Sequence, residues 1–284
     1  MFKVKGSEIM SKTILILGGN GKTGRRVAER LAAKGKEVRL ASRSTAPAFD
    51  WTDPSGWAAV LEGVDAAYVS YQPDLAVPGA VEAIGTLSRV AVEKGVKHLV
   101  LLSGRGEDEA LASEDALKRS GVGYTVIRAS WFFQNFSEAF LVEGIQAGEL
   151  VLPVGDVGEP FIDADDIADI AAAALTESGH AGRTYEVTGP RLMTFSDAVA
   201  EIARKTGRDI RFTTVDIGDY VVLLKQAQIP ADTIWLVHYL FTTVLDGRNE
   251  SLTDGVLQAL GRPPRDFADY VRETAATGVW EDLK

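Results

Sequence analysis

Residues Thr13–Gly24, TILILGGNGKTG, decide the fold. The apolar run Ile14–Leu17 is typical of a strand that is buried on both faces of a parallel sheet. Glycines follow at once, and apolar residues then recur at helical spacing from Val27 to Ala32, before a C-capping Gly35. The order strand, glycine turn, helix predicts the first unit of an α/β domain.

The glycines of this turn fit two registers. Gly18, Gly21 and Gly24 give GxxGxxG, whereas Gly19, Gly21 and Gly24 give GxGxxG. Either register supplies a residue for positive φ, a close approach of backbone to ligand, and a tight contact between helix and strand. The free N–H groups at the helix start would then face a pyrophosphate. We therefore predict a dinucleotide site that includes Gly18, Gly19, Asn20, Gly21, Lys22, Thr23 and Gly24.

Length and composition limit the class of protein. The 284 residues suit one large α/β domain or a nucleotide domain with a smaller lobe, and 46% of them are hydrophobic. The net charge of -10 and the lack of a basic stripe argue against nucleic acid as a partner. No cysteine and no cluster of metal-binding residues occur, and no apolar run approaches the length of a membrane span. We expect a cytoplasmic protein without a metal, whose residues 1–11 are a disordered or non-native extension.

The tip of the second predicted strand, 36–41, bears on the choice of coenzyme. An NAD-selective site usually places Asp or Glu there, but this chain has Ser42-Arg43-Ser44. A guanidinium suits a 2′-phosphate, so Ser42 and Arg43 favour NADP(H) over NAD(H). The alternative is a solvated loop arginine.

Asp50 and Trp51 fall at the position where a third strand would border the adenine ring of the coenzyme. Asp50 could accept a hydrogen bond from the exocyclic amine, and Trp51 could stack on the ring. Packing of Trp51 in the core is an equally good interpretation.

Two later strands should open onto the coenzyme, because ligands bind beyond the carboxyl ends of parallel strands. The strand 65–71 ends in Ser70, Tyr71 and Gln72, and the strand 96–103 ends in Ser103. We assign these four residues to the coenzyme site.

An aromatic segment, SWFFQNF, follows the sixth predicted strand at 130–136. Beside a nicotinamide, Trp131, Phe132 and Asn135 could line a pocket for a flat, apolar substrate. A core hinge between two lobes explains the aromatic residues equally well.

Together these elements predict a Rossmann-type, doubly wound parallel sheet with a smaller, mostly helical C-terminal lobe. We expect the coenzyme-binding core to cover 12–136 and the substrate lobe 137–284, with strands and helices of about 149–190 returning to the core. Short strands are expected at 149–154 and 160–162, and a helix at 167–175.

Several of these motifs resemble one family of proteins. GGNGKTG, SRS, LLSG, SGVGYTVIRASWFFQNF and PFIDADDIADIAAAAL together resemble the NmrA-like branch of the atypical short-chain dehydrogenase/reductases. Within it, GKT, FDW, WFFQNFSE and the terminal GVW are most similar to the festuclavine/agroclavine dehydrogenase group of ergot-alkaloid biosynthesis. The resemblance covers nearly the whole chain. It implies an NADP(H)-binding Rossmann domain in which Arg43 holds the 2′-phosphate.

The chain departs from the larger short-chain family at the catalytic acid. That family uses Tyr-x-x-x-Lys, but residues 104–117 contain no tyrosine. Tyr124 and Arg128 have a similar spacing, but they fall on a predicted buried strand. Of the usual Ser/Tyr/Lys set only Ser103 is left.

The absence of the Tyr-x-x-x-Lys acid favours substrates that accept hydride without protonation by such an acid. Hydride addition to an iminium gives a neutral amine, and a quinone or conjugated C=C spreads the developing charge. We expect an NADPH-dependent reductase of such an acceptor, with Ser103 or Tyr71 as a hydrogen-bond donor and a small-molecule substrate; a homodimer is compatible with this. The alternative is an NADP(H)-binding redox sensor or regulatory protein without turnover.

Overall fold

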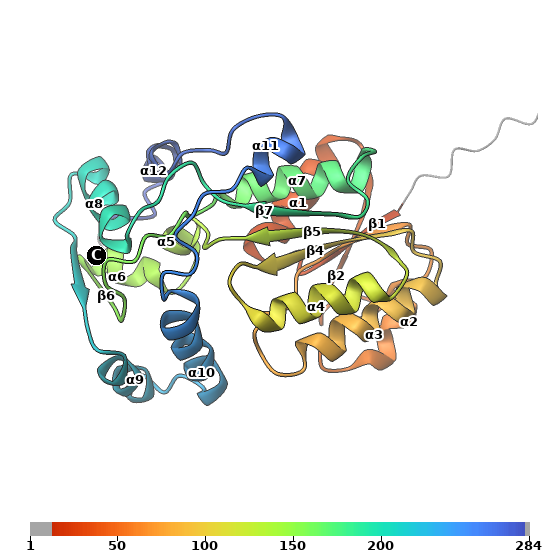
Figure 1. Ribbon diagram of the computed structural model, residues 1–284, viewed down its shortest axis with the longest axis horizontal. Helices are drawn as coiled ribbons and strands as arrows, with labels where there is room; N and C mark the ends of the chain where they lie inside the picture. The colour runs from red at the N-terminus through yellow and green to blue at the C-terminus, as the bar shows by residue number, and fades with distance from the viewer. Residues whose placement is uncertain (1–12, 282–284) are drawn as a thin grey trace, which may run out of the picture.

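The computed structural model describes residues 13–281, so the expected extension at 1–11 lies outside the described residues. A parallel six-stranded sheet forms the centre of the larger part, and a smaller lobe lies beyond one end of its strands (Figure 1). The strand order is β2-β1-β3-β4-β5-β7. The strands are β1 (Thr13–Leu17), β2 (Glu37–Ala41), β3 (Ala66–Val69), β4 (His98–Gly104), β5 (Gly123–Ala129) and β7 (Arg183–Val187).

The sheet is buried on both faces, as the apolar run of β1 predicts. Ile14 and Ile16 belong to one core cluster, whereas Leu15 and Leu17 belong to another. Alternate side chains of one strand therefore face opposite layers of helices. This arrangement confirms the doubly wound class expected from the sequence.

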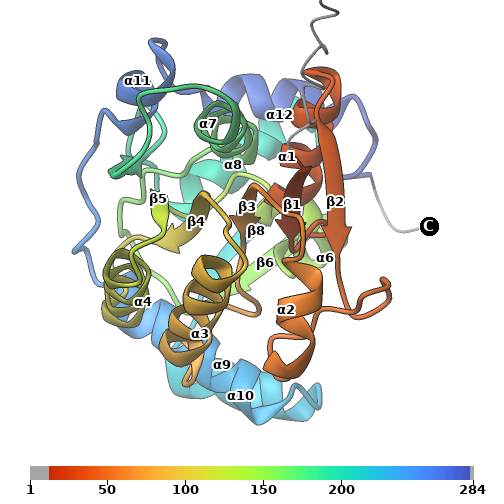
Figure 2. The ribbon, with the colours of Figure 1, turned by 90° about the vertical axis from the view of Figure 1, so that its right-hand side faces the viewer.

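Helices cover each face of the sheet (Figures 1 and 2). One layer contains α1 (Lys22–Ala33) and α7 (Ala164–Thr176), with α11 (Gly255–Leu260) packed against α7 and β7. The other layer contains η1 (Pro54–Gly56), α2 (Trp57–Val60), α3 (Ala80–Glu93) and α4 (Asp108–Arg119).

Helices α1 and α7 are joined by charged side chains as well as by packing. Arg30 of α1 binds both Asp165 and Asp169 of α7, and its contact with Asp169 is 3.0 Å long. The α7 helix starts at Ala164, three residues before the predicted start, because Asp163 caps it by accepting a hydrogen bond from the Asp165 N–H.

The smaller lobe has its own core, built largely from aromatic side chains. Phe136, Phe161 and Phe195 are fully buried there in edge-to-face contacts. A two-stranded parallel sheet, β6 (Glu149–Leu152) and β8 (Arg211–Thr214), belongs to this lobe. Its helical segments are α5 (Asn135–Glu138), α6 (Leu141–Ala147), α8 (Phe195–Thr206), α9 (Ile217–Gln226), α10 (Ala231–Tyr239), η2 (Leu240–Val244) and α12 (Phe267–Ala275).

Two predicted strands are wrong. Around Asp50 the chain forms only an isolated bridge to Asp53, because the Asp50 carboxylate binds the backbone N–H and hydroxyl of Thr52 and folds the segment into a turn. At 160–162 a single bridge joins Ile162 to Phe132. The strand at 149–154 is present as β6, but it pairs in the lobe rather than in the main sheet.

The topology decides where a ligand can bind. The chain passes from β1 to β2 on one side and then crosses to β3 on the other side of β1. Such a reversal leaves a crevice beyond the carboxyl ends of the two central strands. None of the described helices has both the length and the apolar character needed to cross a membrane.

Candidate functional site

Two of the three roles predicted for the glycines between β1 and α1 are confirmed, namely a positive φ and a tight contact between helix and turn. Gly18 has φ +81°, which favours glycine, and its carbonyl accepts the Gly21 N–H at 2.9 Å. A Cβ on Gly24 would overlap the Gly18 carbonyl, so this glycine lets the helix pack against the turn. Gly19 lacks a positive φ, and the GxxGxxG register is therefore the one that the backbone uses.

A groove of about 530 Å³ begins at this turn and runs over the end of β2. Its walls bring together the sequence-predicted residues of the adenosine half. They are Gly18, Gly19, Asn20, Gly21, Ser42, Arg43, Asp50, Trp51 and Gln72.

Arg43 is exposed at this groove, and the structure gives it no ion pair or hydrogen bond among the described residues. A guanidinium in this state is available for an anionic ligand. Asp50 faces the same groove, and the hydrogen bonds from Thr52 lower the pKa of its carboxyl. The groove therefore offers one unpaired cation beside one carboxylate.

Trp51 packs as the core interpretation predicts, while stacking on adenine stays a prediction. Its ring lines the groove and also packs in an aromatic cluster, with centroid distances of 4.8 Å to Phe49 and 4.7 Å to Tyr71. The cluster holds the ring in place beside the groove.

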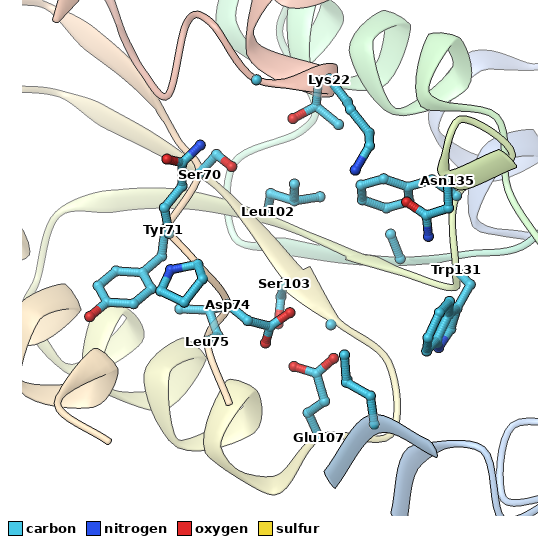
Figure 3. Close-up of a pocket in the computed structure, with 18 of the residues that line it drawn as sticks. Lys22, Ser70, Tyr71, Asp74, Leu75, Leu102, Ser103, Glu107, Trp131 and Asn135 are labelled. Carbon is cyan, nitrogen blue, oxygen red and sulfur yellow. The ribbon is translucent and has the colours of Figure 1, made fainter. Parts of the chain in front are cut away.

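A second cavity, of about 350 Å³, continues from the first and shares Gly21, Gln72 and Pro73 with it. It lies over the carboxyl ends of β3, β4 and β5 and extends to the smaller lobe (Figure 3). This cavity brings together the other predicted residues, Lys22, Thr23, Ser70, Tyr71, Ser103, Trp131, Phe132 and Asn135. Gly24 lines neither cavity.

Ser103 lies at the floor of this cavity, but its proton is already engaged. The hydroxyl donates to Glu114 Oε1 at 2.8 Å, and Arg128 donates to both oxygens of the same carboxylate. Burial raises the pKa of Glu114, but the hydrogen bonds from Arg128 and Ser103 outweigh it and lower the pKa overall. Ser103 can accept a hydrogen bond from a ligand more readily than it can donate one.

Tyr71 is turned away from the centre of the cavity. Figure 3 shows its hydroxyl directed away from Ser103 and from Trp131. Its ring packs against Trp51 on the adenosine side. The structure therefore does not bring the two predicted hydrogen-bond donors, Ser103 and Tyr71, to one point.

The aromatic segment after β5 both packs in the core of the smaller lobe and lines the cavity. Trp131 packs edge-to-face on Phe195 and Phe241 of the smaller lobe, at 5.5 Å each, and also lines the cavity. Across from it, Lys22 reaches into the cavity toward Asn135, and burial lowers the pKa of its amine (Figure 3).

Two carboxyl groups that the sequence did not single out face this cavity. Asp74 follows β3, and Glu107 precedes α4; Figure 3 shows their side chains turned toward one another below Ser103. Burial and then the Asp74 charge raise the pKa of Glu107 well above its usual value. In the sequence, Glu107, Asp108 and Glu109 look like ordinary acids of a helix start, so no local signal distinguishes Glu107.

The comparisons with known proteins agree with this geometry. A family model described as NAD(P)H-binding matches residues 18–178, more than half of the chain. The chain belongs to this NAD(P)H-binding family. Agroclavine dehydrogenase of Claviceps fusiformis is 30% identical, over 94% of this chain and 98% of its own length. NAD(P)H azoreductase of Xenophilus azovorans is 28% identical, over 93% of this chain and 98% of its own length.

Solved structures share the fold. An NADPH-dependent quinone oxidoreductase of Escherichia coli, solved with NADPH, superposes with a TM-score of 0.77 at 21% identity, over 92% of this chain and 99% of that one. The agroclavine dehydrogenase match confirms the NmrA-like branch of the atypical short-chain dehydrogenase/reductases that the sequence motifs resemble. The expectation of a nicotinamide coenzyme is confirmed by the family.

The two cavities of this NAD(P)H-binding protein adjoin one another at Gly21, Gln72 and Pro73, and we predict that they hold the two halves of the coenzyme. The groove at the glycine turn offers free N–H groups at a helix start and an unpaired arginine, which suit phosphates. The second cavity starts where the groove ends and has mixed polar and aromatic walls. Within the described part of the chain, no group of three or more His, Asp or Glu side chains is arranged to hold a metal ion.

Proposed function

We propose that this protein is an NADPH-dependent reductase that transfers hydride to an activated acceptor, namely an iminium, a quinone or a conjugated C=C. The observation that carries the proposal is the open cavity of about 350 Å³ at the nicotinamide end of the coenzyme groove. A protein that only senses the coenzyme needs room for the nicotinamide, but it does not need the apolar wall of Trp131, Phe140 and Leu240 that extends the cavity toward the smaller lobe. The cavity therefore favours the reductase over a redox sensor.

The preference for NADPH rests on the tip of β2. Ser42, Arg43 and Ser44 stand where an NAD-selective site places an acid, and Arg43 is exposed at the groove without an ion pair among the described residues. A 2′-phosphate would give this guanidinium a partner of opposite charge. The neighbouring Ser42 hydroxyl can add a hydrogen bond.

The cavity walls indicate what kind of molecule is reduced. Trp131 and Phe132 form one side, and Phe140, Leu236 and Leu240 add apolar surface from the smaller lobe. Phe140 is 53% exposed, so the mouth of the cavity is itself apolar. Such walls suit a flat, apolar acceptor and exclude water from around it.

When bound, NADPH supplies the hydride. The residues of the chain hold the acceptor: Trp131 offers a flat surface, while Lys22 and Asn135 offer donors for a polar atom. Such positioning lowers the barrier because the reacting groups no longer have to find one another. Relatives and structural neighbours named as an azoreductase, a quinone oxidoreductase and an agroclavine dehydrogenase support this class of acceptor.

Oxidation of NADPH by the purified protein, followed with a panel of quinones, conjugated enones and iminium salts, tests the proposal. We expect turnover with at least one class, and a Trp131→Ala variant with KM for that acceptor raised about tenfold, while its affinity for NADPH is unchanged. Tight NADPH binding without turnover of any acceptor would instead support the sensor.

A further inference from the structure

The side chain of Glu107 occupies an unusual place for a residue that directly precedes a helix. It is the N-cap of α4, yet its side chain does not cap the helix. Its carboxyl lies instead against the backbone of Gly104, where any Cβ would overlap it. The Glu107 carboxyl therefore lies at the floor of the cavity instead of capping α4. A capping hydrogen bond usually stabilises a helix by about 1 kcal/mol.

This carboxyl group is buried and not fully satisfied. Glu107 is only 7% exposed, and its Oε2 has no hydrogen-bond partner in the structure. No lysine or arginine of the described chain pairs with it, since the adjacent Arg105 binds Glu186 and the Asn249 carbonyl. A buried polar atom without a partner, at the wall of a substrate cavity, is suited to a ligand.

The carboxylates around Glu107 favour its neutral form. Asp74 faces it from the segment after β3, and Glu109 lies in the first turn of α4, bound by the Tyr239 hydroxyl of α10. Arg248, from the segment after η2, binds Asp246 and the Gly106 carbonyl instead. Two carboxyl groups so close cannot both be ionised at little cost, and they are expected to share one proton.

We propose that Asp74 and Glu107 share a single proton and that Glu107 donates it to the acceptor, in place of the absent Tyr-x-x-x-Lys pair. This inference rests on the proposed reductase function. The acceptor takes hydride at one atom of its double bond, and the electron pair of that bond moves to the other atom. That atom takes the proton as the O–H bond of Glu107 breaks, and water then returns a proton to the carboxylate.

The roles of the two carboxyl groups differ. We assign proton donation to Glu107 because its carboxyl lies against Gly104 at the end of β4, beside Ser103, where the strand opens onto the cavity. Asp74 is a positioning residue, whose charge keeps the proton on Glu107. It accepts the Ala76 N–H at 2.8 Å, which holds its carboxyl in place.

The test compares two acceptors that differ in their need for a proton. A neutral quinone requires one proton with each hydride, whereas a preformed N-alkyl iminium salt requires none. We expect Glu107→Gln to lower kcat for the quinone about 100-fold or more, the range of general acid catalysis, and to change kcat for the iminium salt less than about threefold. Asp115→Asn, at an exposed carboxyl on the same helix that lies beside Lys118, is the matched control and should leave both rates unchanged.

Asp74→Asn should shift the pH profile. Removing the Asp74 charge lowers the pKa of Glu107, so turnover of the quinone should fall at a lower pH than in the wild type. Infrared difference spectra provide a readout without turnover: at pH 7 the wild type should show the C=O band of a protonated carboxyl that Glu107→Gln lacks.

The outcomes separate this proposal from the proposed function. Turnover of the quinone by Glu107→Gln at the wild-type rate, an equal loss with both acceptors, or the absence of the carboxyl band overturns the proton donor and leaves the reductase intact. Failure of the wild type to reduce any acceptor despite NADPH binding overturns the function itself, and the donor with it. A selective loss with the quinone together with the band establishes the donor.

Discussion

The hydroxyl of Ser103 donates a hydrogen bond to Oε1 of the buried Glu114 at 2.8 Å. This contact joins the end of β4 to α4 and continues through Arg128 of β5, which binds Glu114 and Glu186. The serine that the sequence leaves from the usual catalytic set is therefore part of an ion-pair network beneath the cavity. The hydroxyl proton of Ser103 is engaged in the hydrogen bond to the Glu114 carboxylate.

Replacing Ser103 by alanine should affect stability more than catalysis. The loss of a hydrogen bond to a buried carboxylate should lower the free energy of unfolding by about 2 kcal/mol. The kcat for a quinone acceptor should fall less than tenfold, because Ser103 does not donate to the acceptor. Urea unfolding and steady-state kinetics measure the two effects. Ser113→Ala is the control, since that buried hydroxyl has no hydrogen-bond partner in the structure.

Replacing Arg43 by alanine should change coenzyme selectivity. The affinity for NADPH should fall roughly 10- to 100-fold, the range for loss of a charged hydrogen-bonding group, and the affinity for NADH should change little. Fluorescence titration with both coenzymes measures this. Arg39→Ala is the matched control, because Arg39 of β2 binds the carbonyl groups of Val60 and Glu62 away from the groove. Equal losses for NADPH and NADH would contradict the assignment of Arg43 to the 2′-phosphate.

Two glycines of the turn should respond differently to substitution. Gly21 has φ -78°, which any residue can adopt, so Gly21→Val should fold but fill the space between the two cavities and abolish NADPH binding. Gly24→Ala should also impair folding, because the new methyl group would overlap the Gly18 carbonyl. Circular dichroism and NADPH titration separate the two effects. Unchanged NADPH affinity in a folded Gly21→Val protein would remove the turn from the site.

Glu159 should make stability depend on pH. Burial raises the pKa of this carboxyl to about 7 in the folded protein, from a usual value near 4.5. Between these values the folded state holds more protons than the unfolded state, so the contribution of Glu159 to stability falls as pH rises, by about 3 kcal/mol in all. Thermal or urea unfolding at several pH values measures it.

Glu159→Gln keeps an acceptor for the Trp131 N–H and has no proton to lose. The variant should therefore gain stability relative to the wild type as pH rises from 4.5 to 7. Glu62→Gln, at an exposed ion pair with Lys94, is the control and should show no such gain. A wild-type protein and a Glu159→Gln variant with parallel pH curves would show that Glu159 ionises normally.

The glycine turn and the residues that line the groove beside it could be predicted because their signals are local. The apolar run Ile14–Leu17, the spacing of Gly18, Gly21 and Gly24, and the position of Arg43 each depend on neighbours in the chain. Backbone sterics and helix geometry then translate that spacing into a turn with free N–H groups. The strand expected near Asp50 is absent because of another local effect. Hydrogen bonds from Thr52 to the Asp50 carboxylate fold this segment into a turn, which competes with pairing in a sheet.

The sequence by itself determined the parallel sheet, the glycine turn and the class of coenzyme, since each follows from short-range patterns. Only the tertiary structure decided which groups surround the second cavity. It engaged the Ser103 proton with Glu114, turned Tyr71 toward Trp51, and brought Asp74 and Glu107 together below the cavity. These contacts depend on which loops the sheet places side by side and on how deeply their side chains are buried. Neither can be predicted from the spacing of residues along the chain.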